Sequence, residues 1–204
     1  MTARPAPRRR QPTEVRRAMV LEAVPALVAE RGVRGTGIRD IAAAAGVSVG
    51  TLTYHFSGVR EILAEALAVQ LAAYYDPLRE RAATLAPRDG LDLLLAASLD
   101  EETRPHWRLW LECWQDGVWD DERSQHERYT GWHAVLRDLV VAGVADGSLR
   151  CADPDGTAAR LVALVDGLAL QRLRGVPPMS SERAVAHVRA ALADWTGSPR
   201  PTGE

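Results

Sequence analysis

The sequence predicts an all-α protein, with a small three-helix domain at the amino terminus and a larger helical bundle behind it. Two observations support this fold class. Apolar residues recur at spacings of three and four along most of the 204 residues, and no alternating pattern predicts a strand. Proline, glycine and aspartate separate these segments at intervals that suit helices. We expect about nine helices in total.

The first predicted helix lies between Thr13 and Gly32. Val20, Val24 and Val28 recur there at helical spacing. Threonine is a common residue at the start of a helix, and glycine is common just after its end.

The second and third predicted helices are short and lie close together in the sequence. Gly37 is expected to cap the second helix, and Asp40 three residues later supplies half of a capping box. Ser48 is expected to cap the third helix, which runs from Val49 to about Phe56.

The rest of the chain continues the helical pattern. After Gly58 a long fourth helix is expected to end at Pro77, because proline lacks a backbone N–H and clashes with the preceding turn. Further helices are expected at about 78–86, 89–101, 105–118, 121–145, 154–174 and 180–195.

Charge is distributed unevenly between the two ends of the chain. Residues 1–60 hold ten arginines and four acidic residues, a net charge of +6, whereas the remaining 144 residues carry 15 basic and 23 acidic residues, a net charge of −8. This asymmetry favours an amino-terminal part that meets a polyanion, although a solvated charged surface is the alternative. We expect a disordered basic arm at 1–12, a DNA-binding domain at 13–57, a ligand-binding and dimerisation domain at 58–197, and a disordered tail at 198–204.

The sequence also indicates where the protein acts. No apolar run reaches the roughly 18 residues that span a bilayer, and the arginine-rich start leads into no signal-peptide core. Cys113 and Cys151 are the two cysteines of a chain that is large enough to fold without a disulfide framework. We therefore expect a cytoplasmic protein with reduced thiols and no membrane contact.

The stretch "DIAAAAGVSVGTLTYHF" (40–56) has the spacing of a helix-turn-helix. Ala42, Gly46 and Leu52 supply a small residue, a turn glycine and an apolar anchor at offsets that let two helices cross through a three-residue turn. The alternative is a helical hairpin that only packs, which the +6 charge disfavours. The second helix would expose Val49, Gly50, Thr51, Thr53, Tyr54 and His55.

These exposed side chains suit the major groove of DNA. Gly50 lets the backbone approach the duplex, and Thr51 and Thr53 can hydrogen-bond base edges or touch a thymine methyl group. Tyr54 and His55 suit contacts with phosphates.

Residues 19–56 and their continuation to about Leu67 resemble the TetR family of transcriptional regulators in their apolar and glycine positions. Residues 108–175 resemble the carboxy-terminal domain of the branch that includes the betaine-pathway repressor. The resemblance implies a homodimer that binds an operator palindrome on double-stranded DNA. It also implies release by a small-molecule inducer held in the carboxy-terminal domain.

The sequence departs from the family pattern at three positions. Val49 and Val59 stand where lysine is frequent, and Thr53 stands where tyrosine is common. Exposed arginines near these helices could restore contacts with the DNA backbone, and an arginine arm suits a narrow minor groove. These arginines are Arg39, Arg60 and, in the arm, Arg4, Arg8, Arg9 and Arg10. The predicted DNA-binding residues are Arg39, Ser48, Val49, Gly50, Thr51, Thr53, Tyr54, His55 and Arg60.

The last two predicted helices offer a dimer surface. Residues 158–171 are apolar around most of the helix, which predicts cover on two sides, and a second subunit would supply it. Val185, Val188, Leu192 and Trp195 give the last helix an apolar stripe for a four-helix interface. Asp166 interrupts the apolar run, so we expect it to find a hydrogen-bond donor or a ligand.

A tryptophan-rich helix offers a candidate ligand cavity. Trp107, Trp110 and Trp114 share one helix face, which is typical either of a core or of an aromatic-lined pocket. Such a pocket would suit an organic cation through cation–π attraction, or a flat aromatic compound. The predicted ligand-binding residues are Trp107, Trp110, Trp114, Tyr129, His133 and Asp166.

Two other classes of protein were weighed against a regulator. Glu122, His126 and His133 share a helix face and could be metal ligands of an enzyme, but no matching cluster lies elsewhere in the sequence. The sequence contains no P-loop, nucleophile elbow or dinucleotide fingerprint, so we expect no enzyme, metal or cofactor. A ligand-independent architectural DNA-binding protein is the other alternative, and it would not need the tryptophan-rich second domain.

Overall fold

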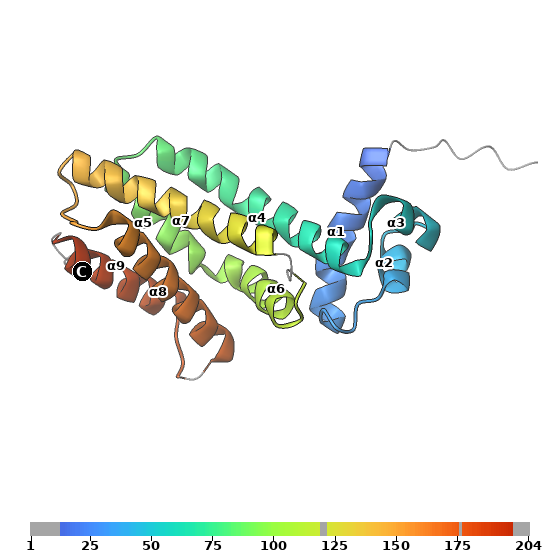
Figure 1. The fold of residues 1–204 in the computed structure, drawn as a ribbon. Coiled ribbons are helices and arrows are strands. Elements are labelled where there is room, and N and C mark those ends of the chain that lie inside the picture. Colours follow the sequence, from blue (N-terminus) through green and yellow to red (C-terminus); the bar gives the residue numbers. More distant parts are fainter. Residues whose placement is uncertain (1–12, 119–121, 176, 198–204) are drawn as a thin grey trace, which may run out of the picture. The chain divides into compact units, whose positions relative to one another are not determined.

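The computed structural model describes residues 13–118, 122–175 and 177–197 (Figure 1). Over these residues it contains nine α-helices, one 3-10 helix and no strand, which confirms the predicted all-α class. The predicted arm at 1–12 and tail at 198–204 lie outside the described residues. No helix in the described ranges is long and apolar enough to cross a membrane.

The chain divides into two compact units between Val69 and Gln70. The helices of the first unit are α1 (Thr13–Arg31), α2 (Ile38–Ala44), α3 (Val49–His55) and the first part of α4 (Val59–Ala83). Its core is built from one apolar face of each helix, namely Val20, Val24, Ile41, Ala42, Leu52, Ile62, Leu63 and Leu67.

Local hydrogen bonds explain why the short helices α2 and α3 begin where they do. An Asp40 carboxylate oxygen accepts the backbone N–H of Gly37 at 3.0 Å, and the Ser48 hydroxyl accepts the N–H of Thr51 at 3.1 Å. Both predicted caps are therefore confirmed, and each satisfies an N–H that the helix itself leaves unpaired.

The turn between α2 and α3 depends on a glycine. Gly46 has φ +66°, a left-handed conformation that side chains with a Cβ rarely adopt. Its N–H donates to Ala43 O at 3.2 Å, and the N–H of Val47 donates to Ala42 O at 3.0 Å. This pair of bonds closes α2 as a Schellman motif and turns the chain directly into α3.

The second unit is a helical bundle. Its elements are the rest of α4, α5 (Pro87–Ser98), the 3-10 helix η1 (Glu101–Thr103), α6 (Arg104–Gln115), α7 (Glu122–Ala145), α8 (Pro154–Arg174) and α9 (Ser181–Thr196). Helix α7 packs against α5 and α8, and α9 packs against α8 and α5 (Figure 1). The centre is filled by fully buried aliphatic residues, including Leu91, Leu94, Leu99, Leu136, Val140, Leu161 and Val165.

The prediction that Pro77 ends the fourth helix is wrong. Helix α4 runs through Pro77 to Ala83, so the separate helix expected at 78–86 does not form. A proline inside a helix costs about 3 kcal/mol. Leu78 and Ala82 follow the proline and pack against the core of the second unit, and burying a side chain such as leucine returns about 1.5–3 kcal/mol. Packing of the following turn therefore offsets the local cost of the proline.

Candidate functional site

Helix α3 is anchored by one buried side chain and exposes most of the others. Leu52 is fully buried, and Phe56 directly after the helix is also buried. Val49, Gly50 and Thr53 are exposed. The Leu52 side therefore anchors the helix in the core of the first unit, and the opposite side is exposed.

The hydroxyl groups along α3 have different roles. Ser48 and Thr51 lie 2.9 Å apart, oxygen to oxygen, and belong to the amino-terminal cap. The Thr53 hydroxyl lies 3.3 Å from the carbonyl oxygens of both Val49 and Gly50, to which it donates, so its own oxygen still has lone pairs for a base edge. Of the two predicted base-contacting threonines, Thr53 is the more exposed.

Gly50 is not required by the fold of the free protein. A Cβ built there would meet only the Ser48 hydroxyl oxygen, at 3.8 Å, which is an ordinary contact. The open space above Gly50 therefore suits the close approach of another molecule to the helix backbone.

The remaining predicted DNA-binding side chains flank this surface. Arg39 and Arg60 are exposed, and Tyr54 has 81% of its surface exposed. The His55 ring packs edge-on against Tyr54 with 4.9 Å between ring centroids. All nine predicted DNA-binding residues thus lie on α2, α3 or the start of α4 in the first unit. Sequence reasoning missed Arg17 of α1, which donates to the backbone of His55.

The tryptophans of α6 do not form one uniform stripe of core residues. Leu109 and Cys113 are the buried residues of this helix. Trp107 packs partly against the core and donates its indole N–H to Ser98 O at 2.7 Å, whereas Trp114 is 53% exposed and stacks on Trp110. The core interpretation therefore holds for Trp107 but not for Trp114.

Aromatic residues of α4, α6 and α7 form a cluster that the sequence analysis did not single out. Tyr75 of α4 lies 5.1 Å from Trp132 of α7, between ring centroids, and Tyr74 lies 5.4 Å from His106 of α6. The Arg79 guanidinium lies 5.7 Å from the centroid of the Trp132 ring. The adjacent tyrosines of "AAYYD" in the fourth helix were the available sequence signal.

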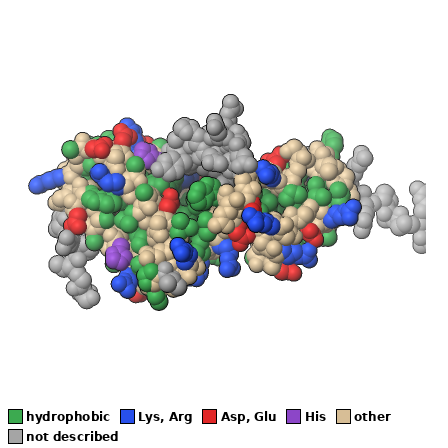
Figure 2. Space-filling view, turned by 60° about the horizontal axis from the view of Figure 1, so that its bottom comes forward, with side chains coloured by type: hydrophobic (Ala, Val, Ile, Leu, Met, Phe, Trp, Pro, Cys, Tyr) green, Lys and Arg blue, Asp and Glu red, His purple; other side chains and the backbone are tan. Residues whose placement is uncertain are grey.

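Burial in this aromatic cluster shifts the pKa of its titratable groups. Burial raises the pKa of Tyr75 to about 12 and lowers the pKa of His106 below its usual value, so both side chains are neutral at pH 7. His106 Nδ1 and Arg79 Nε are buried without a hydrogen-bond partner in the part of the chain that the structure describes. Polar atoms of this kind can be satisfied by a ligand. Figure 2 shows hydrophobic side chains at the surface of the helical bundle.

The other predicted ligand-binding residues lie in different places. His133 Nε2 of α7 is 3.2 Å from the carbonyl oxygen of Asp155, and the side chain of Tyr129 lies outside the described residues. The Asp166 carboxylate of α8 has no hydrogen bond or ion pair with a described residue, and burial raises its pKa to about 6. Among the described residues, Asp166 therefore lacks the donor that was one of its two expected partners.

The metal alternative rests mainly on side chains outside the described residues. The side chains of Glu122 and His126 lie outside the description, and no group of three or more metal-ligating side chains occurs among the described residues.

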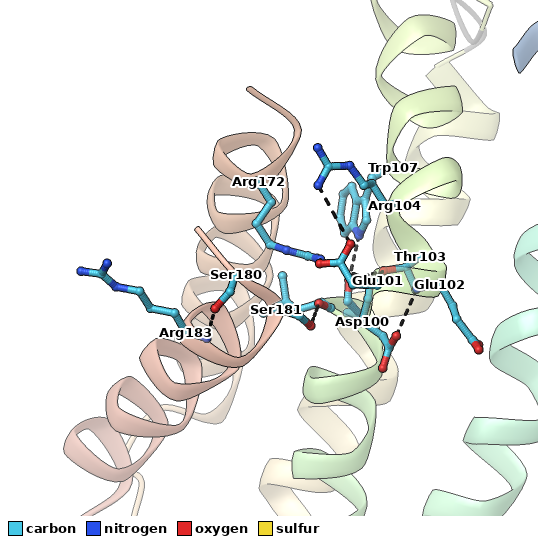
Figure 3. Close-up of polar contacts among 12 residues, drawn as sticks. Asp100, Glu101, Glu102, Thr103, Arg104, Trp107, Arg172, Ser180, Ser181 and Arg183 are labelled. Atoms are coloured by element: carbon cyan, nitrogen blue, oxygen red, sulfur yellow. Dashed lines mark hydrogen bonds and ion pairs between the residues drawn. The ribbon is translucent and has the colours of Figure 1, made fainter. Parts of the chain in front are cut away.

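A polar network joins the start of α6 to α8 and α9 (Figure 3). The Arg172 side chain of α8 is 2% exposed, lies 2.5 Å from Glu101 Oε1, and donates to the carbonyl oxygen of Asp100 at 3.5 Å. The Ser181 hydroxyl of α9 donates to Leu99 O. This network fixes the joint between α5 and α6 to the last two helices.

The apolar stripe of α9 faces its own subunit. Val188 and Leu192 are buried, and Val185 and Trp195 pack partly against the same core. The expectation that this stripe forms the dimer interface is therefore wrong, because an amphipathic helix with one apolar stripe uses it to cover the nearest core. On α8 the uncovered positions include Ala163 and Gly167, which are small and exposed.

Comparison with known proteins identifies both parts of the chain. Residues 20–66 match the family described as bacterial regulatory proteins, tetR family, and residues 87–197 match the family described as BetI-type transcriptional repressor, C-terminal.

Individual proteins are similar over most of the chain. The HTH-type transcriptional regulator PksA of Bacillus subtilis is 32% identical over 166 residues, which cover 78% of this chain and 80% of PksA. The HTH-type transcriptional regulator BetI of Paraburkholderia xenovorans is 28% identical over 178 residues, which cover 84% of this chain and 89% of BetI. A crystal structure of a putative transcriptional regulator from Saccharomonospora viridis in complex with choline is 30% identical, with a TM-score of 0.77 over 88% of this chain and 95% of that one. These matches show that the chain is a transcriptional regulator that belongs to the TetR family and has a BetI-type carboxy-terminal domain.

Proposed function

We propose that this regulator binds a palindromic operator as a homodimer through α3 and is released by a small-molecule ligand held among the helices of its second unit. The observation that carries the proposal is the exposed face of α3, held on a capped helix-turn-helix by one buried leucine. We further propose the division into a DNA-binding domain at 13–57 and a ligand-binding and dimerisation domain at 58–197.

The exposed face of α3 has the chemistry of a major-groove reader. Thr53 and Thr51 can bond base edges, and Gly50 allows the helix backbone to come close to the duplex. Arg39 and Arg60 carry positive charges that suit the DNA phosphates on either side of the major groove. A dimer presents two copies of α3 to half-sites about 34–36 Å apart, one helical turn of DNA or a multiple of it. A protein that acts on operator DNA works in the cytoplasm, which is the location we propose.

Helix α8 supplies a surface that suits a second copy of the chain. Ala163 and Gly167 are one helical turn apart and exposed, and no described residue, apart from the backbone of α8 itself, lies within 4 Å of a Cβ built at Gly167. Small residues at this spacing let the backbones of two helices approach closely, and a symmetric dimer repeats the contact on both subunits.

The aromatic cluster of the second unit supports a ligand site. Tyr75 and Trp132 offer ring faces, and such groups suit an organic cation. The similar regulator from Saccharomonospora viridis was crystallised with choline, a quaternary ammonium compound, so we place organic cations first among the ligands to test. A flat aromatic compound is the second class, because it could stack on the same rings.

In the dimer, the two α3 helices can be spaced so that they fit the operator or so that they do not. Release from DNA requires the ligand to bind the second conformation more tightly than the first. A coupling of about 1–3 kcal/mol is usual for such systems, and it lowers operator affinity about 5- to 150-fold. Because linkage is reciprocal, operator DNA must weaken ligand binding by the same factor.

The ligand part of the proposal is tested by titration of the protein–operator complex. An operator is first selected from random DNA, and choline and other organic cations are then added while fluorescence anisotropy reports bound DNA. We expect one compound to release the DNA at the concentration that changes tryptophan emission. An architectural protein would keep its DNA and show no thermal stabilisation across a wider metabolite screen, which would overturn the ligand-dependent mechanism.

A further inference from the structure

We propose that Arg17 of α1 is a positioning residue that sets the orientation of α3 for operator recognition. The proposal rests on the operator-binding role of α3 proposed above. It adds a residue that lies outside the exposed face of that helix and acts on DNA binding through α3.

Arg17 contacts the carboxy-terminal end of α3 directly. Its Nη1 donates to the carbonyl oxygen of His55, the last residue of α3, at 2.6 Å. Its guanidinium lies 4.3 Å from the centroid of the buried Phe56 ring. A cation at this end of a helix pairs with carbonyl groups that the helix leaves free and interacts favourably with the helix dipole.

The same guanidinium is held by two carboxylates of α4. Arg17 Nη2 bonds to Glu65 and lies 3.6 Å from Glu61 Oε1. Glu61 and Glu65 are one turn apart near the start of α4, and both are partly exposed. Arg17 therefore connects α1, the end of α3 and the beginning of α4 through a single side chain.

The short connection between α3 and α4 joins the same network. The backbone N–H and the hydroxyl of Ser57 donate to Glu61 Oε2 at 2.6 and 2.5 Å. These bonds, together with Arg17, lower the pKa of Glu61 below its usual value. Since only residues 56–58 separate the two helices, the Arg17 and Ser57 contacts fix both sides of the joint.

Helix α3 needs such contacts to hold one orientation. It has seven residues, so it is too short to be stable by itself, and Leu52 is its fully buried anchor. One anchor allows a helix to pivot about that point. A second attachment at His55 restricts the pivot, and an interface read by base edges requires the side chains to be held within a fraction of an ångström.

Arg17 is poorly placed to act as a phosphate contact itself. Its side chain is 28% exposed, its Nη atoms already meet a carbonyl oxygen and a carboxylate, and two acidic groups lie beside its charge. A positioning role and a phosphate role predict different effects on specific and non-specific DNA binding, because phosphate contacts are shared by all sequences.

The test compares Arg17→Gln with Arg16→Gln, which removes the same charge from the neighbouring residue of α1. Each full-length protein is titrated with its selected operator and with unrelated DNA at several salt concentrations. We expect Arg17→Gln to weaken operator binding at least tenfold more than Arg16→Gln does. We expect the affinity for unrelated DNA, and the slope of log affinity against log salt, to change by the same amount in the two variants. If Arg17 contacts a phosphate, Arg17→Gln should instead weaken binding to the operator and to unrelated DNA alike and flatten the slope by about 0.9. That result would overturn the proposal.

Glu65→Gln gives an independent test with the opposite electrostatic expectation. Removing a negative charge strengthens DNA binding if only charge matters, whereas loss of the Arg17 partner weakens operator binding if α3 is being held in place. We expect weaker operator binding, and we expect Glu65→Gln to add little when Arg17 is already replaced, because both changes break one contact. Stronger operator binding by Glu65→Gln would contradict the proposal even if Arg17→Gln failed to fold. If the wild-type protein binds the operator and unrelated DNA equally well, that result counts instead against the proposed operator-binding function itself.

Discussion

At the scale of single residues, Gly50 is a position that the fold does not require to be glycine but that the proposed DNA contact does. Leu52 anchors α3 and Ser48 caps it, so the fold needs both of these side chains. Gly50 does neither, because a Cβ at this position meets only one atom at an ordinary distance. Its lack of a side chain is therefore best explained by the approach of the duplex.

We predict that Gly50→Ala leaves the protein as stable as the wild type or stabilises it by up to about 1 kcal/mol, because alanine is the better helix former. Operator affinity should nevertheless fall. Urea unfolding and fluorescence anisotropy measure the two effects. Gly131→Ala is the matched control, since Gly131 is an exposed glycine of α7 and no described residue outside the α7 backbone lies within 4 Å of a Cβ built there. Equal operator affinity for both variants would show that Gly50 does not face the DNA.

Asp166 gives a prediction about pH. Burial raises its pKa from 3.8 to about 6, so the folded state holds this proton more tightly than the unfolded chain does. The contribution of Asp166 to stability therefore falls as pH rises from about 4 to about 6, and the full penalty is present above that range.

We predict that Asp166→Asn melts at a higher temperature than the wild type at pH 7.5, and that this difference shrinks as pH falls from about 6 to about 4. Melting curves of both proteins across this range provide the measurement. The comparison cancels the opposite trend of groups such as Glu61, whose lowered pKa makes stability fall in acid. A difference that does not depend on pH would mean that Asp166 keeps an ordinary pKa.

At the scale of elements, the 3-10 helix η1 shows how an exposed residue can matter to stability. Glu101 is 61% exposed, but its partner Arg172 is 2% exposed. Replacing Glu101 leaves a buried guanidinium without its carboxylate, and an unsatisfied buried group costs about 1–3 kcal/mol.

We predict that Glu101→Gln lowers the free energy of unfolding by about 1–3 kcal/mol. Glu102→Gln, in the same 3-10 helix, should change it by no more than about 0.5 kcal/mol, as is usual for a surface substitution. Chemical denaturation of the two variants makes the comparison. Equal stability would mean that Asp100 O alone is enough to satisfy Arg172.

The elements also show which features the sequence could predict. The caps at Gly37 and Ser48 were predictable because each depends on residues within three positions. Three features depend on contacts from distant segments, which no local pattern contains. They are the passage of α4 through Pro77, the inward direction of the α9 stripe and the buried face of α6 at Leu109 and Cys113.

The candidate site divides in the same way. The exposed face of α3 follows from helical periodicity around Leu52, so its residues were predictable. Arg17 and the pairs formed by Tyr75 with Trp132 and Tyr74 with His106 join segments that are 32 to 57 positions apart, so they required the structure.

At the scale of the whole molecule, the proposed dimer depends on the open surface at Gly167. We predict that Gly167→Glu produces monomers but keeps the helical content of the chain, because no described residue outside the α8 backbone lies within 4 Å of a Cβ at this position. Analytical ultracentrifugation and circular dichroism provide the two measurements, with Gly131→Glu as the control. A dimer of wild-type affinity would place the interface on another surface of the protein.

Operator recognition by paired α3 helices is the central claim, and selection from a random pool of double-stranded DNA tests it most directly. The wild-type protein should enrich an inverted repeat whose half-sites lie one helical turn apart or a multiple of it. Thr53→Ala should enrich the same spacing with a relaxed preference at one base position of each half-site. A pool that shows no enriched sequence, or a single unpaired motif bound equally well by Thr53→Ala, would contradict the account.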